Sequence, residues 1–150
     1  MRHPQPVPRP MPTPPRHECP QPRLRALQAQ VKNVTTVDLV AGATVPYNTL
    51  ITIDAGLRDI KLNGDGSFTL SRGIYMIDWQ VDTTGENDTD FGFMVDGVIN
   101  SANIDINSEL VNVRNESATI KVIATAPATL ITPTSPNSTQ ANIRIVRVTD

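Results

Sequence analysis

The feature that most constrains the fold is a strict two-residue alternation in the middle of the chain. In the stretch GIYMIDWQVD, alternate positions hold Tyr75, Ile77, Trp79 and Val81, and the positions between them hold Met, Asp, Gln and Asp. Successive side chains of a β-strand point to opposite faces, so the pattern predicts a central strand with one buried and one polar face. Aromatic residues make up only 4% of the 150 residues. We therefore expect the few large ones to anchor the core, with Phe68, Phe91 and Phe93 beside the four residues named above.

The composition and the residue pattern from residue 34 to residue 150 are typical of an all-β region. This region contains all eight glycines, is rich in β-branched residues and has no amphipathic segment of helical length. Turn sequences recur about every ten residues, and they are NGDG at 63–66, TTGEND at 83–88, DGVI at 96–99, SPNST at 135–139 and a tight turn at Gly73. The strands predicted between them are 34–40, 44–53, 57–62, 67–71, 73–83, 89–96, 98–105, 109–114, 117–124, 128–133 and 140–148. Many short antiparallel strands favour a two-sheet jelly-roll sandwich.

Residues 1–32 have a different composition and form a candidate arm. Nine of the 13 prolines lie there, at positions 4, 6, 8, 10, 12, 14, 15, 20 and 22, without any glycine. Alternate prolines remove backbone donors and hold their neighbours extended, so this segment is expected to be disordered or polyproline-like and to act as a spacer. Its P-x-x-P spacings are also compatible with an SH3-type groove. The arm has 6 basic and 1 acidic side chains, whereas the remaining residues have 7 basic and 14 acidic ones.

The segment RLRALQAQVKNV, residues 23–34, connects the arm to the β region. It has no glycine or proline, and Leu24, Leu27, Val31 and Val34 follow a three-four-three spacing. That spacing is typical of a coiled-coil seam, although it lasts for only about one and a half heptads. The segment is expected to be a frayed helical turn or a plain linker, or a short helical neck where several chains meet. The predicted division is therefore an arm at 1–32 and a β domain at 33–150.

The sequence contains few residues of the kinds that enzymes use for catalysis. Both histidines, His3 and His17, and the single Cys19 belong to the arm, so the β domain lacks histidine triads and histidine or thiolate zinc sites. No nucleotide-binding or nucleophile-elbow motif occurs. Cys19 is expected to be a free thiol or to bridge two chains. We expect no enzyme and no organic cofactor.

Calcium is the one metal that the sequence leaves open. The stretch VDTTGENDTD brings four carboxylates into nine residues, namely Asp82, Glu86, Asp88 and Asp90. Carboxylate oxygens suit calcium, but the spacing differs from that of an EF-hand, and a solvated acidic loop has the same composition. The stretch LNGDGS at 62–67 poses the same question. Nucleic acid is not expected as a partner, because the β domain is acidic and the arm offers no stacking aromatics.

Two further expectations concern membranes and self-association. No run approaches the roughly 18 apolar residues that span a bilayer, and the first residues lack a secretory apolar segment. Near residue 145, Ile143, Ile145 and Val146 do not follow a single alternation. Part of that strand is therefore expected to be covered on both faces, by an interface with another chain or by a bulge or ordinary core packing.

The central stretch FTLSRGIYMIDWQVDTT resembles the pattern of the tumour-necrosis-factor-like superfamily, which includes the globular head of complement component 1q. Other stretches resemble the C-terminal domain of the collagen-like glycoprotein on bacterial spore exosporia. They are TVPYNTLI, DFGFMVDGVINSANI and the segment from ATIKVIAT to IRIVRVTD. The resemblance covers residues 33–150. This chain differs in carrying a proline-rich arm where that glycoprotein has a Gly-X-Y stalk, and in having Ala126-Pro127-Ala128 at a turn.

This resemblance implies a jelly roll that packs as a homotrimer. The function that it implies is a non-enzymatic structural or adhesive module on a bacterial spore or cell surface, reached without a secretory signal. The arm would tether the head to a spore-layer or surface protein. The alternative is a recognition head for a glycan or a receptor, of receptor type or at a phage fibre tip. A trimeric enzyme is the third possibility.

Overall fold

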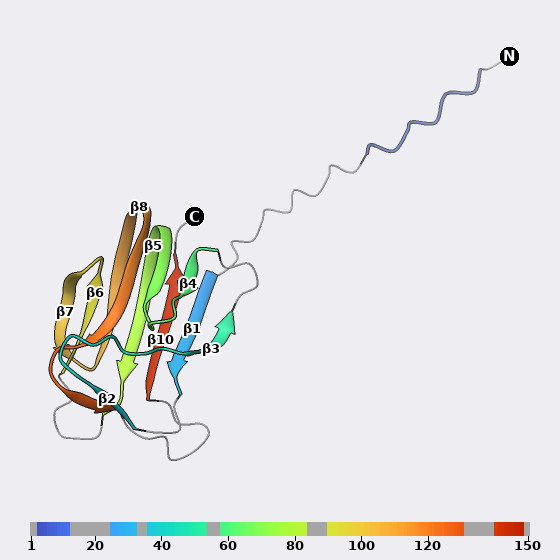
Figure 1. Ribbon diagram of the computed structural model, residues 1–150. Coiled ribbons are helices and arrows are strands. Elements are labelled where there is room, and N and C mark those ends of the chain that lie inside the picture. Colours follow the sequence, from blue (N-terminus) through green and yellow to red (C-terminus); the bar gives the residue numbers. More distant parts are fainter. Residues whose placement is uncertain are drawn as a thin grey trace.

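The computed structural model describes residues 3–12, 25–32, 36–53, 58–83, 90–130 and 140–148. Within these ranges the chain forms ten strands and no helix, which confirms the all-β prediction (Figure 1). The strands are β1 (Arg25–Val31), β2 (Val37–Leu39), β3 (Thr49–Ile53), β4 (Ile60–Leu62), β5 (Phe68–Val81), β6 (Phe91–Val95), β7 (Val98–Ile104), β8 (Ile106–Ala124), β9 (Ala128–Leu130) and β10 (Ala141–Arg147). Residues 3–12 are exposed and belong to no strand.

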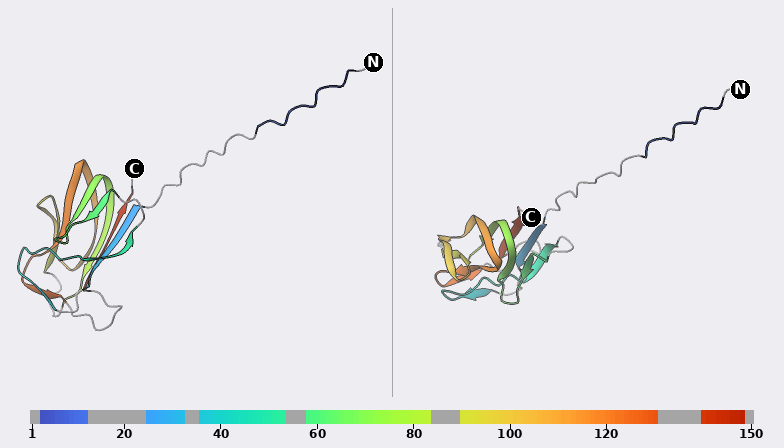
Figure 2. Two further views of the ribbon diagram at one scale, coloured as in Figure 1. Left: turned by 45° about the vertical axis from the view of Figure 1, so that its right-hand side comes forward. Right: turned by 90° about the horizontal axis from the view of Figure 1, so that it is seen from above.

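The strands form one large antiparallel sheet and one small one. The large sheet has the order β3-β1-β10-β5-β8-β6-β7, with β4 paired to β5, and the small sheet consists of β2 and β9. Strands distant in sequence are therefore neighbours, since β10 lies between β1 and β5 (Figure 1). The view from above in Figure 2 shows the large sheet curving into a two-layered sandwich. This is the jelly-roll architecture that the strand pattern predicts.

Two long strands carry the curvature. The sequence predicts a turn at Gly73 and a break near residue 115, but β5 and β8 continue through both places. A β-bulge shifts the register from Ser71↔Ser117 to Gly73↔Val113. A bulge bends a strand without ending it. This explains why the glycine at position 73 suggests a turn in the sequence. Gly73 has a φ angle of 152°, and a Cβ atom there would lie 2.6 Å from Nε of Arg147, so a side chain at this position would displace that arginine.

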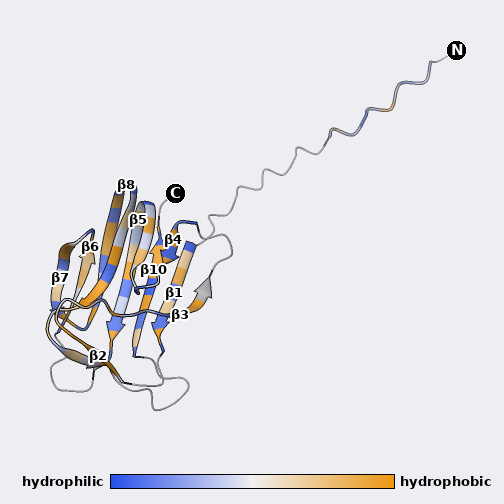
Figure 3. Ribbon diagram, in the orientation of Figure 1, coloured by the Kyte–Doolittle hydropathy of each residue, from blue (hydrophilic) through white to orange (hydrophobic). Residues whose placement is uncertain are grey.

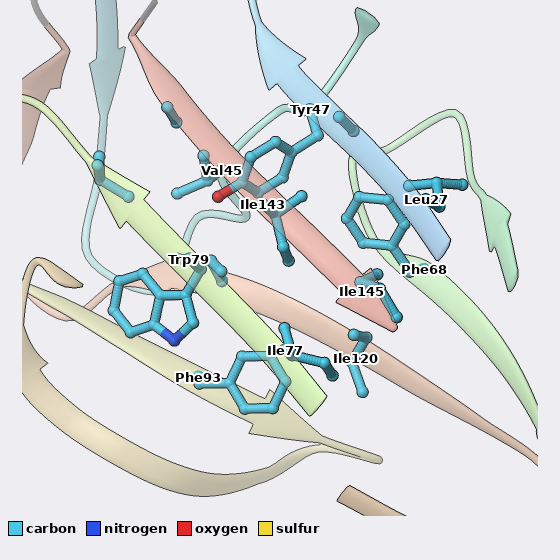
Figure 4. Close-up of a cluster of buried hydrophobic side chains, with 14 of the residues drawn as sticks. Leu27, Val45, Tyr47, Phe68, Ile77, Trp79, Phe93, Ile120, Ile143 and Ile145 are labelled. Carbon is cyan, nitrogen blue, oxygen red and sulfur yellow. The ribbon is translucent and has the colours of Figure 1, made fainter. Parts of the chain in front are cut away.

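The alternation in β5 produces the core. Figure 4 shows Trp79 and Ile77 lying among side chains of other strands, including Phe93, Ile120 and Ile145. The other predicted aromatic and aliphatic anchors are also buried, with exposed fractions of 2% or less for Phe68, Tyr75, Ile77, Trp79, Val81, Phe91 and Phe93. The segment before β3 covers one side, where the rings of Tyr47 and Phe68 lie 5.6 Å apart between centroids.

The predicted helical turn or neck at 23–34 is wrong, because residues 25–31 form strand β1. All seven of its residues pair with β10, and part of its other edge pairs with β3. Leu27, Ala29 and Val31 are buried, so the two-residue period decides the structure and the three-four spacing of the apolar residues does not. The jelly roll therefore begins at Arg25 instead of residue 33. Leu24 and Val34 lie outside the described residues.

The hairpin between β6 and β7 has the turn that its sequence predicts. Asp96 and Gly97 both have positive φ angles, 49° and 79°, and they join the paired residues Val95 and Val98. A two-residue turn with both φ angles positive matches the twist of the flanking strands, which is why Asp-Gly favours it. The NGDG turn is also present, with Gly66 at φ 91°. The predicted turn at 135–139 and most of that at 83–88 lie outside the described residues.

Candidate interaction surface

One face of the large sheet points away from the core and combines exposed apolar side chains with amides and two charged groups. We define the outer face as the side chains that alternate with the buried ones within residues 26–30 of β1, 142–146 of β10, 76–80 of β5 and 106–110 of β8. Figure 3 shows the alternating bands of hydropathy along these strands. Its members are all half-buried or exposed. They are Ala26, Gln28, Gln30, Met76, Asp78, Gln80, Ile106, Ser108, Leu110, Asn142, Arg144 and Val146.

An apolar row crosses this outer face. The strand register places Ala26 opposite Val146, Val146 opposite Met76, and Met76 opposite Leu110. Met76 is 50% exposed and Leu110 is 70% exposed, and Ile106 at 60% lies farther along β8. Large apolar side chains that adjoin one another on a monomer surface usually mark a place of association.

A polar row lies beside the apolar row. In register order it consists of Gln28, Arg144, Asp78 and Ser108. Oγ of Ser108 donates a hydrogen bond to Oδ1 of Asp78 at 2.5 Å, and Nε2 of Gln28 donates to Oδ1 of Asn142 at 3.2 Å. These side chains contribute to a groove of about 440 Å³, whose lining consists of Gln28, Asp78, Trp79, Gln80, Ile106, Asn107, Ser108, Asn142 and Arg144. Amides, one hydroxyl, one carboxylate and one guanidinium equip the groove for hydrogen bonding and ion pairing.

The three residues predicted for an interface do not share a face. Ile143 and Ile145 have no exposed surface and belong to the core, so the interface prediction is wrong for both. Their strand β10 alternates regularly, and Val146 is the member that lies on the outer face, in the apolar row. Leu110 and Ile106 are not among the residues predicted for an interface. The alternation in INSELVNV is the signal that could have found them.

The predicted calcium ligands are only partly covered by the structure. Asp82 and Asp90 belong to the described residues, whereas Glu86 and Asp88 lie outside them. Oδ1 of Asp82 accepts a hydrogen bond from Nε2 of Gln80 at 3.2 Å. Within the described ranges, no three acidic, histidine or cysteine side chains are grouped as metal ligands. Calcium at 82–90 stays a prediction.

The second acidic candidate, LNGDGS, uses its carboxylate within the turn. Oδ1 of Asp65 accepts hydrogen bonds from Oγ of Ser67 at 2.6 Å and from its backbone N–H at 2.9 Å. These bonds, above all the one from the Ser67 hydroxyl, lower the pKa of Asp65. The carboxylate thus stabilises the turn between β4 and β5.

A buried carboxylate that the sequence analysis missed lies inside the sandwich. Glu109 is only 6% exposed. It accepts hydrogen bonds from Nδ2 of Asn100 at 2.8 Å, Nδ2 of Asn107 at 2.9 Å, Nε1 of Trp79 at 3.4 Å and Oγ of Ser101. Because these donors come from β5, β7 and β8, Glu109 ties β7 to the layer that carries the outer face.

Another carboxylate, Asp59, holds β1 and β10 at their common end. Its Oδ2 pairs with Arg25 and, at 3.2 Å, with Arg147, and its Oδ1 accepts from Oγ of Ser71 at 2.9 Å. Burial alone would raise the pKa of Asp59. The hydrogen bonds from Ser71 and Arg25 and the charges of both arginines outweigh burial and hold this pKa below its usual value.

None of the described residues forms a helix long and apolar enough to cross a membrane. No protein-family model matches the chain. No curated protein matches it either.

Comparison with solved structures identifies the fold. The Eiger TNF structure from S. frugiperda superposes with a TM-score of 0.56 at 13% sequence identity, covering 85% of this chain and 94% of that one. A Bacillus subtilis protein, YXIM, gives a TM-score of 0.29 at 14% identity, with 77% of this chain and 30% of that chain covered, and this score is too low to carry an argument. The predicted likeness to the spore glycoprotein stays a prediction. The chain has the jelly-roll fold of tumour-necrosis-factor-like proteins.

Proposed function

We propose that this chain is a non-enzymatic structural or interaction module that assembles as a homotrimer. The observation that carries the proposal is the apolar row of the outer face, in which Met76 and Leu110 adjoin in register and expose about half or more of their surface. The tumour-necrosis-factor-like fold supports three as the number of copies. A second copy placed over the row would remove its apolar surface from water.

The energetics favour such an arrangement. Burying a large aliphatic side chain completely contributes roughly 1.5–3 kcal/mol. Met76, Leu110 and Ile106 retain much of that contribution in the isolated chain, because each is at least half exposed. Repeated around a symmetry axis, these contributions offset part of the entropy that association costs.

The solution mass of the full chain tests the proposal, by light scattering coupled to size exclusion. We expect the wild type to have the mass of a trimer and Leu110→Asp to have that of a monomer. Val98→Asp is the matched control, since Val98 is 69% exposed against 70% for Leu110 and lies beside the β6–β7 turn, away from the outer face. A wild type that remains monomeric at micromolar concentrations would defeat the proposal.

A finer proposal places the module in the outer layer of a bacterial spore, with the arm as its tether. The resemblance to the exosporium glycoprotein supports this setting, and the exposed residues 3–12 suit a spacer. A fluorescent fusion lacking residues 1–24 keeps β1 and should still assemble, but it should no longer localise to the spore surface. If it localises like the full chain, the arm is not the tether.

A recognition head is the second candidate function. The groove of about 440 Å³ favours it, because four of the side chains that line it are amides, which suit hydrogen bonding to a glycan. They are Gln28, Gln80, Asn107 and Asn142. A glycan array probed with the full chain would reveal such binding, and Gln80→Ala should then weaken it. Binding that Gln80→Ala leaves unchanged would place any glycan elsewhere.

A further inference from the structure

The outer face contains one basic and one acidic side chain. Arg144 on β10 and Asp78 on β5 are direct neighbours in the strand register, and both are exposed. The other members of the outer face are uncharged. The face is therefore neutral and contains both members of an ion pair.

The two charges nevertheless do not pair within one chain. Of the described basic side chains, only Arg25 and Arg147 form ion pairs, both with Asp59. No hydrogen bond joins the Arg144 side chain to another described residue. The Asp78 carboxylate accepts its hydrogen bond from Ser108, which lies on β8 and therefore on the side away from Arg144. Within the part of the chain that the structure describes, one guanidinium is thus without a carboxylate, at the centre of the surface that the proposed assembly covers.

We propose that Arg144 of one copy pairs with Asp78 of the next copy, an inference that rests on the self-association proposed above. In a ring, one patch of each copy meets a different patch of its neighbour. Arg144 and Asp78 lie on adjacent strands, so Arg144 can belong to the first patch and Asp78 to the second. Positive and negative charges then alternate around the axis, whereas arginines alone would repel one another.

The position of the pair between apolar side chains gives it a specific effect. The row of Met76 and Leu110 lies on one side of it and Ile106 lies on the other. Association would exclude water from both sides, and a lower local dielectric strengthens the attraction between opposite charges. An unpaired charge in the same place is costly. The apolar row therefore supplies the attraction, and the charge pair selects the register in which the copies meet.

Charge reversal in the full chain tests the pairing. Arg144→Glu makes the outer face doubly negative, Asp78→Arg makes it doubly positive, and the double variant restores opposite charges in exchanged positions. Lys61→Glu is the matched control, because Lys61 is exposed on β4, outside the outer face. Each single variant should raise the dissociation constant at least about tenfold, while the control and the double variant should associate like the wild type.

Mixing the two single variants separates pairing between copies from pairing within one. The glutamate introduced at position 144 of one variant then faces the arginine introduced at position 78 of the other. Two of the three contacts in a mixed trimer join opposite charges and none does in a trimer of one variant alone, so the mixture should associate more tightly than either variant by itself. If only the double variant reassembles and the mixture does not, the pair forms within one copy and the inference is overturned. It is equally overturned if Arg144→Glu associates like Lys61→Glu, although the trimer itself then stands. A monomeric wild type would remove both proposals.

Discussion

At the scale of single residues, close backbone approaches decide which positions tolerate a side chain. Gly66 and Gly64 belong to the same turn, but a Cβ atom on Gly66 would lie 2.5 Å from O of Val45, 2.7 Å from Cα of Pro46 and 2.8 Å from N of Tyr47. A Cβ atom on Gly64 would meet nothing within 4 Å. The turn between β4 and β5 therefore packs on the segment before β3 at Gly66 alone.

This contrast gives a matched pair of variants. Gly66→Ala combines a φ angle of 91° with contacts to backbone atoms that cannot rotate away, so we expect it to lower the free energy of unfolding by about 2 kcal/mol or more. Gly64→Ala should change that free energy by less than about 1 kcal/mol. Urea denaturation of both variants measures the difference. Equal stability of the two would mean that the turn does not pack on residues 45–47.

The opposite faces of β5 give a second matched pair at this scale. Trp79 is 2% exposed, while its neighbour Gln80 is exposed on the outer face. Trp79→Ala should lower the free energy of unfolding by roughly 3–5 kcal/mol, because truncation leaves a cavity, and it also removes a donor to Glu109. Gln80→Ala should cost far less. A Trp79→Ala variant that melts at the wild-type temperature would contradict the facing of this strand.

At the scale of elements, the sequence predicts strands best where polar and apolar residues alternate without interruption. The alternation from Tyr75 to Val81 places β5 and orients its side chains. It fails at β1, because six of the seven residues of RALQAQV are good helix formers and its apolar residues also fit a helical seam. What decides β1 is pairing with β10 and β3, residues more than 100 and about 20 positions away. Local propensity does not contain that information.

Asp59 links these same elements and makes their docking depend on pH. Its pKa is lower in the folded chain than in the unfolded one. The stability that it contributes is therefore complete above the unfolded pKa of about 3.9, and it is lost as the pH falls through the folded pKa. Asp59→Asn should lower the free energy of unfolding at pH 7 by roughly 2 kcal/mol and should flatten its decline below about pH 4. Urea unfolding between pH 2 and pH 7 measures both effects. If the variant loses stability at acid pH as steeply as the wild type, other carboxylates cause that loss.

At the scale of the whole molecule, the sequence predicts the core better than the interaction surface. Buried positions can be recognised in the sequence because large apolar residues recur there at every second position. The outer face has the same period but a mixed composition, so Met76 and Leu110 are recognisable as neighbours only when β5 and β8 are in register. Register follows from the turns and the bulge at Gly73, which no alternation encodes. Two of the three predicted interface residues, Ile143 and Ile145, accordingly lie on the buried face of β10.

The place where the arm ends and the domain begins follows from the same pairing, and two truncations test it. Removing residues 1–24 leaves β1 intact and should leave the melting temperature and the number of chains in the assembly unchanged. Removing residues 1–32 deletes β1, which exposes the pairing edges of β10 and β3 and removes Leu27, Ala29 and Val31 from the core. Each large apolar side chain lost in this way costs roughly 1.5–3 kcal/mol, a large fraction of the stability of a domain of this size. Circular dichroism melting and light scattering should therefore show a cooperative trimer for the first truncation and an unfolded or aggregating chain for the second. If the second melts as cooperatively as the first, β1 is dispensable and the domain does begin near residue 33.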